Sequence, residues 1–170
     1  MPKEKGLEDL FHDTLRDVYY AERKIVTALQ KMKRAALAEE LENALDRHRE
    51  QTQGQIERLQ RVFEIIGKPA RGKTCEAIEG LIGEAEEVIE EYKGTPSIDA
   101  GLIACAQAVE HYEISRYGTL KRWAEELGHG EAATLLDETL KEEAQTDADL
   151  TKLADGFAND RAKAGKGKVA

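Results

Sequence analysis

Apolar residues recur at three- and four-residue steps over most of the chain, which is the pattern of amphipathic α-helices. Glycine and proline residues interrupt this pattern at a few points and divide the chain into helical segments. The predicted segments cover about residues 6–33, 37–66, 74–92, 98–127 and 130–159. Four of them are long and the third is short. The pattern therefore predicts an all-α protein.

Four long helices that each carry one apolar stripe can bury these stripes by packing against one another. We therefore predict a four-helix bundle in which the short segment 74–92 is an extra crossover helix. Residues 1–159 would form this single domain, and Ser97 would cap the fourth segment, 98–127. The last stretch, 160–170, is rich in Lys, Gly and Ala and is predicted to be a flexible basic tail.

The composition supports this fold class and narrows the function. Aromatic residues make up only 5% of the chain and there are three prolines, which excludes an all-β sandwich or barrel. The net charge of −9 disfavours a nucleic-acid partner, because such a partner is held by basic residues. No apolar run is long enough for a membrane span, and no signal-peptide pattern opens the chain. With only two cysteines, these features predict a soluble, cytoplasmic protein without a disulfide framework.

Polar residues occupy stripe positions where apolar residues are expected. In one choice of phase for the last helix these residues are Glu22, His48, Thr52, Glu110, Glu113 and Glu142. A second phase, through the leucines at 136, 140 and 150, places Glu143 inward instead, and the sequence leaves both open. Each long helix thus contributes an acid or a histidine near its middle. Antiparallel packing would bring these side chains to a common level.

Several unpaired carboxylates in one interior would be costly, so protons or bound cations must neutralise them. We find no Lys or Arg on the four stripes, and two divalent ions would balance four carboxylates. Carboxylate and imidazole ligands on facing helices are the construction of di-iron and di-manganese bundles. The sequence therefore predicts a dinuclear site for iron, or else manganese. Glu50 and Gln51 flank the site, and whether either takes part is left open.

Several stretches carry a resemblance to a known family. They are Ala21-Glu22, residues 48–52 followed by Gly-Gln-Ile-Glu-Arg at 54–58, the run at 77–82, and above all Val-Glu-His-Tyr-Glu-Ile at 109–114 with Tyr-Gly-Thr-Leu at 117–120. Over about residues 7–158 the chain resembles the YciE/YciF-type family of the ferritin-like superfamily. The resemblance implies a rubrerythrin-like four-helix bundle with an added short helix, often dimeric. It also implies a dinuclear metal centre and a role in stress.

By the superfamily pattern, the resemblance makes metal ligands of Glu22, His48, Glu110, Glu113 and Glu142. Ferritin-like di-iron proteins usually carry Glu-x-x-His on both the second and the last bundle helix. Here Leu45 stands three residues before His48, and Gln145 stands three residues after Glu142. The chain therefore has fewer ligands for a second metal, which counts against oxygen activation more than against metal binding.

Three functional hypotheses follow. The first is a di-iron oxidoreductase that oxidises Fe(II) or reduces peroxide, with O2 or peroxide as its partner. The second is a stress protein that binds iron or manganese without turnover. The third is a structural or partner-binding bundle, as a homodimer, whose interior acids are protonated.

Overall fold

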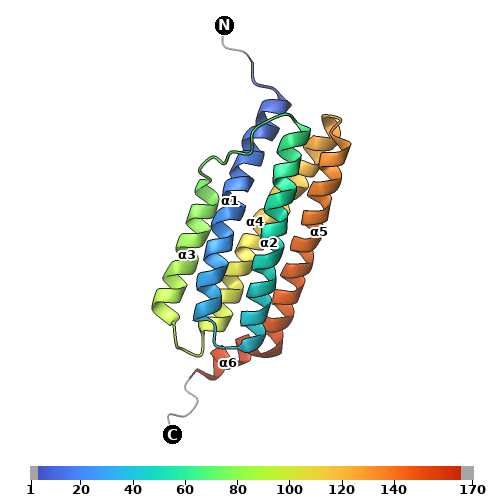
Figure 1. The fold of residues 1–170 in the computed structure, drawn as a ribbon. Coiled ribbons are helices and arrows are strands. Elements are labelled where there is room, and N and C mark those ends of the chain that lie inside the picture. The colour runs from blue at the N-terminus through green and yellow to red at the C-terminus, as the bar shows by residue number, and fades with distance from the viewer. Residues whose placement is uncertain (1–3, 166–170) are drawn as a thin grey trace.

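The computed structural model describes residues 4–165 and consists of helices and their connections (Figure 1). The elements are α1 (Leu7–Ala35), α2 (Glu39–Ile65), α3 (Glu76–Tyr92), α4 (Ile98–Glu126), α5 (Gly130–Leu153), a π-helical turn η1 (Ala154–Ala158) and α6 (Asn159–Ala164). No strand occurs between residues 4 and 165. The predicted all-helical class is confirmed. None of the described helices combines the length and apolar character that crossing a membrane requires.

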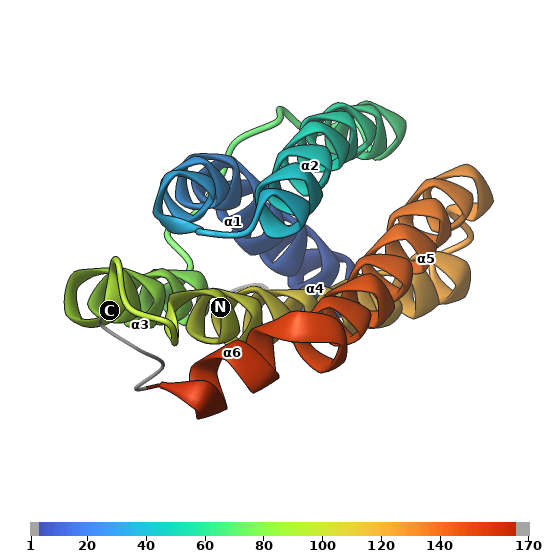
Figure 2. The same ribbon diagram turned by 90° about the horizontal axis from the view of Figure 1, so that it is seen from below.

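Helices α1, α2, α4 and α5 form a four-helix bundle, and α3 packs outside it against α1 and α4 (Figures 1 and 2). Adjacent bundle helices are antiparallel. For example, Gln51 and Arg58 of α2 contact Thr146 and Glu142 of α5, in reversed order along the two helices. Because α2 and α4 run in the same direction, the chain must cross the length of the bundle between them (Figure 1). Helix α3 makes that crossing, as predicted.

The helix ends are set by glycine in three places. Gly67, Gly94 and Gly128 follow α2, α3 and α4, and their φ angles are 66°, 77° and 77°. This left-handed conformation is readily adopted by glycine and ends a helix. The expectation for Ser97 is corrected: it occupies the N-cap position of α4, but its side chain makes no capping hydrogen bond.

A buried aspartate holds the turn between α1 and α2. Asp99, at the start of α4, accepts hydrogen bonds from the backbone amides of Leu37 (2.8 Å) and Ala38 (3.1 Å). It also accepts a hydrogen bond from Arg161 of α6 (3.1 Å). The chain therefore continues as helix to Ala164, where the sequence predicted a flexible tail from residue 160. This long-range contact is invisible in the local pattern. The end of that predicted tail, 166–170, lies outside the described residues.

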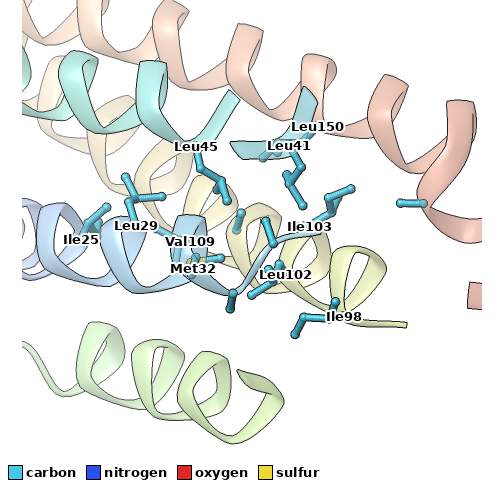
Figure 3. Packing of buried hydrophobic residues seen from close by; sticks show 14 of the residues in the cluster. Ile25, Leu29, Met32, Leu41, Leu45, Ile98, Leu102, Ile103, Val109 and Leu150 are labelled. Carbon is cyan, nitrogen blue, oxygen red and sulfur yellow. The ribbon is translucent and has the colours of Figure 1, made fainter. Parts of the chain in front are cut away.

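The apolar core is divided into two parts along the bundle. The proximal core lies near the α1–α2 turn and includes Ile25, Leu29, Leu41, Leu45, Leu102, Ile103 and Leu150 (Figure 3). The distal core lies towards the other end and includes Phe11, Leu15, Leu59, Phe63, Leu120 and Leu136. Between these two parts, each bundle helix turns buried polar side chains inward. The candidate site occupies this polar layer.

Candidate metal centre

The polar layer gathers five ionisable side chains from the four bundle helices. They are Glu22 of α1, His48 of α2, Glu110 and Glu113 of α4, and Glu143 of α5. Each is at most 2% exposed. The two glutamates of α4 are three residues apart, so both lie on one face of that helix. Antiparallel packing brings the middle residues of the four helices to one level, as the sequence predicted.

Four of the five side chains can present ligand atoms to one point. One atom from each of His48, Glu110, Glu113 and Glu143 lies within 4.8 Å of the others. His48 Nε2 is 2.7 Å from Glu110 Oε1 and 3.9 Å from Glu143 Oε2. Neither of the two atoms in the shorter contact has a hydrogen-bond partner, so this contact is not a hydrogen bond. A nitrogen and an oxygen placed in this way can act as ligands of one ion.

Glu22 stands beside this group. Its Oε1 accepts a hydrogen bond from Tyr117, which is completely buried, while its Oε2 has no hydrogen-bond partner. The carboxyl group of Glu22 also interacts with that of Glu113. Tyr117 thus fixes the orientation of one carboxylate oxygen and leaves the other free at the edge of the cluster.

The two glutamates left open on α5 have different surroundings. Glu143 is fully buried and accepts a hydrogen bond from the amide of Gln55. Glu142 is partly exposed and is held by Arg58, whose two terminal nitrogens donate to its two oxygens at 2.6 and 2.9 Å. The phase that placed Glu142 inward is therefore corrected. The side chain of Arg58 is only 25% exposed, so its guanidinium group lies at the rim of the bundle beside the candidate site. The sequence pattern had placed no Lys or Arg near this site.

Burial changes the acidity of the cluster. Loss of hydration, followed by the charge of Glu143, raises the pKa of Glu22 from 4.5 to about 8. Loss of hydration, together with its contact to Glu143, raises the pKa of Glu110 to about 12. The pKa of Glu113 is also raised well above its ordinary value by burial and by the neighbouring carboxylates. Burial lowers the pKa of His48, which keeps its imidazole neutral and able to bind a metal.

Outside the cluster, the remaining candidates have other roles. Gln51 is exposed and accepts a hydrogen bond from Thr146 (3.3 Å), and Glu50 is also exposed. Neither belongs to the group of side chains that could hold an ion.

Comparison with known proteins shows which family the chain belongs to. Residues 6–163 match the family described as "Domain of unknown function (DUF892)". The chain belongs to this family. Protein YciF of Escherichia coli (strain K12) is 48% identical over 160 residues, which cover 94% of this chain and 96% of that protein.

Solved structures agree with this assignment to the DUF892 family. The crystal structure described as the E. coli stress protein YciF matches with a TM-score of 0.87 at 48% identity, over 92% of this chain and 99% of that one. A protein described as "YcfI, a putative structural protein from Rhodopseudomonas palustris" matches with a TM-score of 0.85 at 47% identity, over 88% and 96%. A protein from Xanthomonas campestris, 19% identical, matches with a TM-score of 0.75 over 93% and 97% and shows the fold alone.

Within this DUF892 chain, sequence reasoning assigned no role to two residues that support the cluster. Gln55 is buried and its amide contacts both Glu142 (3.0 Å) and Glu143. Thr139 is buried on α5 and accepts a hydrogen bond from Arg58 (2.9 Å). Gln55 could have been found, because it follows His48 by seven residues and therefore lies on the same face of α2.

Proposed function

We propose that this protein binds two divalent metal ions, iron or manganese, in a ferritin-like dinuclear centre within the polar layer. The observation that supports the proposal is the set of unpartnered ligand atoms at the centre of the bundle. Both oxygens of Glu110 and of Glu113, one oxygen each of Glu22 and Glu143, and both nitrogens of His48 are buried without a hydrogen bond. Buried polar atoms without partners are rare and need an explanation.

The donor set fits such ions in charge and in chemistry. The four glutamates Glu22, Glu110, Glu113 and Glu143 carry four negative charges when ionised, which two divalent ions balance. Imidazole and carboxylate donors suit iron and manganese. Binding of cations would lower the cost of burying ionised carboxylates whose pKa values are raised in the metal-free protein.

The surrounding side chains would hold these ligands in place. Gln55 donates to Glu143, and Tyr117 donates to Glu22. Such hydrogen bonds orient ligating carboxylates and are part of most metal sites. Arg58 pairs with Glu142 and keeps that carboxylate at the rim, away from the buried ligands. The proximal and distal cores close the layer from both ends of the bundle.

We further propose that the centre oxidises Fe(II) or reduces peroxide during stress. Iron held by carboxylates and an imidazole, with positions left open, supplies reactivity towards O2 or peroxide. Support for a role in stress comes from the 48% identical E. coli relative, whose structure is described as that of a stress protein. We also propose that the protein acts as a cytoplasmic homodimer.

Two adjacent glutamates of α5 provide the decisive experiment. Metal content would be measured by elemental mass spectrometry on wild type, Glu143→Gln and Glu142→Gln, each loaded with Fe(II) or Mn(II) and then desalted. Wild type and Glu142→Gln should retain roughly two ions per chain, and Glu143→Gln should lose at least one of them. Equal metal content in wild type and Glu143→Gln would contradict the proposed ligand set.

Catalysis is tested separately from binding. The loaded wild type should oxidise added Fe(II), or consume hydrogen peroxide, faster than buffer does. Metal binding without either activity would leave a protein that stores or buffers metal.

The competing function is a structural bundle that binds no metal. It is favoured by the raised pKa values, because protons alone could neutralise Glu22 and Glu110 at neutral pH. A 47% identical relative is described as a putative structural protein, which agrees with this alternative. Wild-type protein that retains no metal after loading would decide for it.

A further inference from the structure

A fully buried metal site needs a route by which the ion enters. Glu22, Glu110 and Glu143 are 0% exposed, Glu113 is 1% exposed and His48 is 2% exposed. The proximal and distal cores block the two ends of the bundle with apolar side chains. The ion must therefore pass between two helices, and a path of this kind is one of the requirements for a proposed metal site.

A cavity of about 330 Å³ opens between α2 and α5 and reaches the cluster. Its lining includes His48, which is also a member of the candidate metal centre. The ring of His48 has Nε2 next to Glu110, while Nδ1 is buried without a hydrogen-bond partner. The imidazole therefore separates the cavity on one side from the buried carboxylates on the other.

Side-chain oxygens are available along the walls of this cavity. Glu50 and Gln51 line it from α2, and Thr146 and Asp149 line it from α5. Arg47 also lines the cavity, and Asp149 is paired with Lys152 at 2.9 Å, so the wall offers a cation oxygen ligands rather than an excess of negative charge. Carboxylate, amide and hydroxyl oxygens can replace the water molecules of a hard divalent ion as it moves inward.

One hydrogen bond between lining residues crosses from α5 to α2. The hydroxyl group of Thr146 donates to Oε1 of Gln51 at 3.3 Å. This bond is long and solvent-exposed, so breaking it costs little. Rotation of these two side chains can therefore break the bond and widen the cavity without separating the helices.

We infer that the α2–α5 cavity above His48 is the entrance through which hydrated divalent cations reach and leave the metal centre. This inference rests on the proposed metal-binding function. It assigns a role to residues that hold no metal in the final complex. A change in the cavity should therefore alter the rate of metal exchange and leave the equilibrium affinity unchanged.

Two substitutions would plug the cavity from opposite walls. Ala44 lines it on α2, one helical turn before His48, so the ring in Ala44→Phe would cover the imidazole. Gln145 lines it on α5 and is exposed, so Gln145→Trp adds bulk at a position that tolerates it. Ala148→Phe is the matched control, because Ala148 is exposed on α5 but does not line the cavity.

The probe is Co²⁺, whose visible absorption reports its ligands and which needs no oxidant. Chelator-stripped protein is mixed with Co²⁺ in a stopped-flow instrument, and the loaded protein is then mixed with excess EDTA. Ala44→Phe and Gln145→Trp should slow both uptake and release by about tenfold or more, while the final absorbance and the dissociation constant stay those of wild type. Ala148→Phe should behave as wild type.

The outcomes separate the two proposals. Unchanged uptake in both plugged variants, or equal slowing in Ala148→Phe, would overturn the entrance and leave the metal centre standing. Failure of wild type itself to take up Co²⁺ would overturn both. Should one plugged variant fail to fold, the other alone decides.

Discussion

The metal-free protein should lose stability as the pH rises through neutrality, which is the reverse of ordinary acid unfolding. Burial, followed by the charge of Glu143, raises the pKa of Glu22 from 4.5 to about 8. In the unfolded chain this carboxyl group ionises near 4.5. Between these two values the folded state binds one proton more than the unfolded state, so the free energy of unfolding falls with pH.

The size of the effect follows from that pH window. One extra proton in the folded state lowers the free energy of unfolding by about 1.4 kcal/mol per pH unit. His48 acts in the opposite direction below its ordinary pKa of 6.5, because burial keeps it neutral in the folded state. The clear window is therefore pH 6.5 to 8, where Glu22 alone should remove about 2 kcal/mol. The raised pKa values of Glu110 and Glu113 act in the same direction and steepen the slope.

Urea unfolding followed by circular dichroism, in the presence of a chelator, measures this slope across the window. Glu22→Gln should flatten it, since glutamine does not titrate. Glu142→Gln is the control and should keep it: although burial alone would raise the pKa of Glu142, the hydrogen bonds from Arg58 and Gln55 lower it, so this residue stays ionised throughout. Saturating Mn²⁺ should reverse the sign, because metal ligands must lose their protons. Stability of the metal-free wild type that is constant or rises between pH 6.5 and 8 would refute the reasoning.

Two further predictions concern the fold that holds the site. Asp99→Ala should lower the free energy of unfolding, measured by urea unfolding, by about 2–4 kcal/mol. The substitution removes the buried acceptor of two backbone amides and of Arg161. A loss below about 0.5 kcal/mol would contradict this role. Gly101→Ala and Gly118→Ala on α4 form a matched pair measured in the same assay: a Cβ at Gly101 would lie 2.8 Å from Cγ1 of Val88, whereas one at Gly118 would meet nothing within 4 Å. Gly118→Ala should stabilise α4 by about 0.5–1 kcal/mol. Gly101→Ala should destabilise the packing of α3 against α4 by about 1–3 kcal/mol. Equal effects of the two substitutions would show that α3 does not pack closely on Gly101.

The local pattern predicted the helices well because their causes are local. Long runs without proline and apolar residues at helical spacing define α1, α2, α4 and α5, and glycines end three helices at the expected points. Prediction failed where a distant residue decides the outcome. Helix α6 is held by the pair between Arg161 and Asp99, which are 62 residues apart in the chain. The residues from 160 onward have the composition of a basic tail, so local sequence rules do not predict that the helix continues through them.

The candidate site shows the same division. The positions of Glu22, His48, Glu110 and Glu113 on apolar stripes indicated burial, and all four are buried. The choice between Glu142 and Glu143 was not available from the sequence. Either phase of the last helix gives an apolar face that could be buried. Contacts with Gln55 and Arg58 of α2 determine that Glu143 lies inward and Glu142 at the rim.

By itself, the sequence determined that this is a helical bundle with acids and a histidine at the middle of its apolar faces. Periodicity and the low cost of these residues in a helix are properties of each segment alone. Only the tertiary structure decided which carboxylates meet. Arg58 and Gln55 of α2 meet α5 across 80 or more residues of chain, and their donors hold Glu142 at the rim and Glu143 in the interior. The physical reason is that a buried carboxylate is set by its partners in space, and those partners come from other helices.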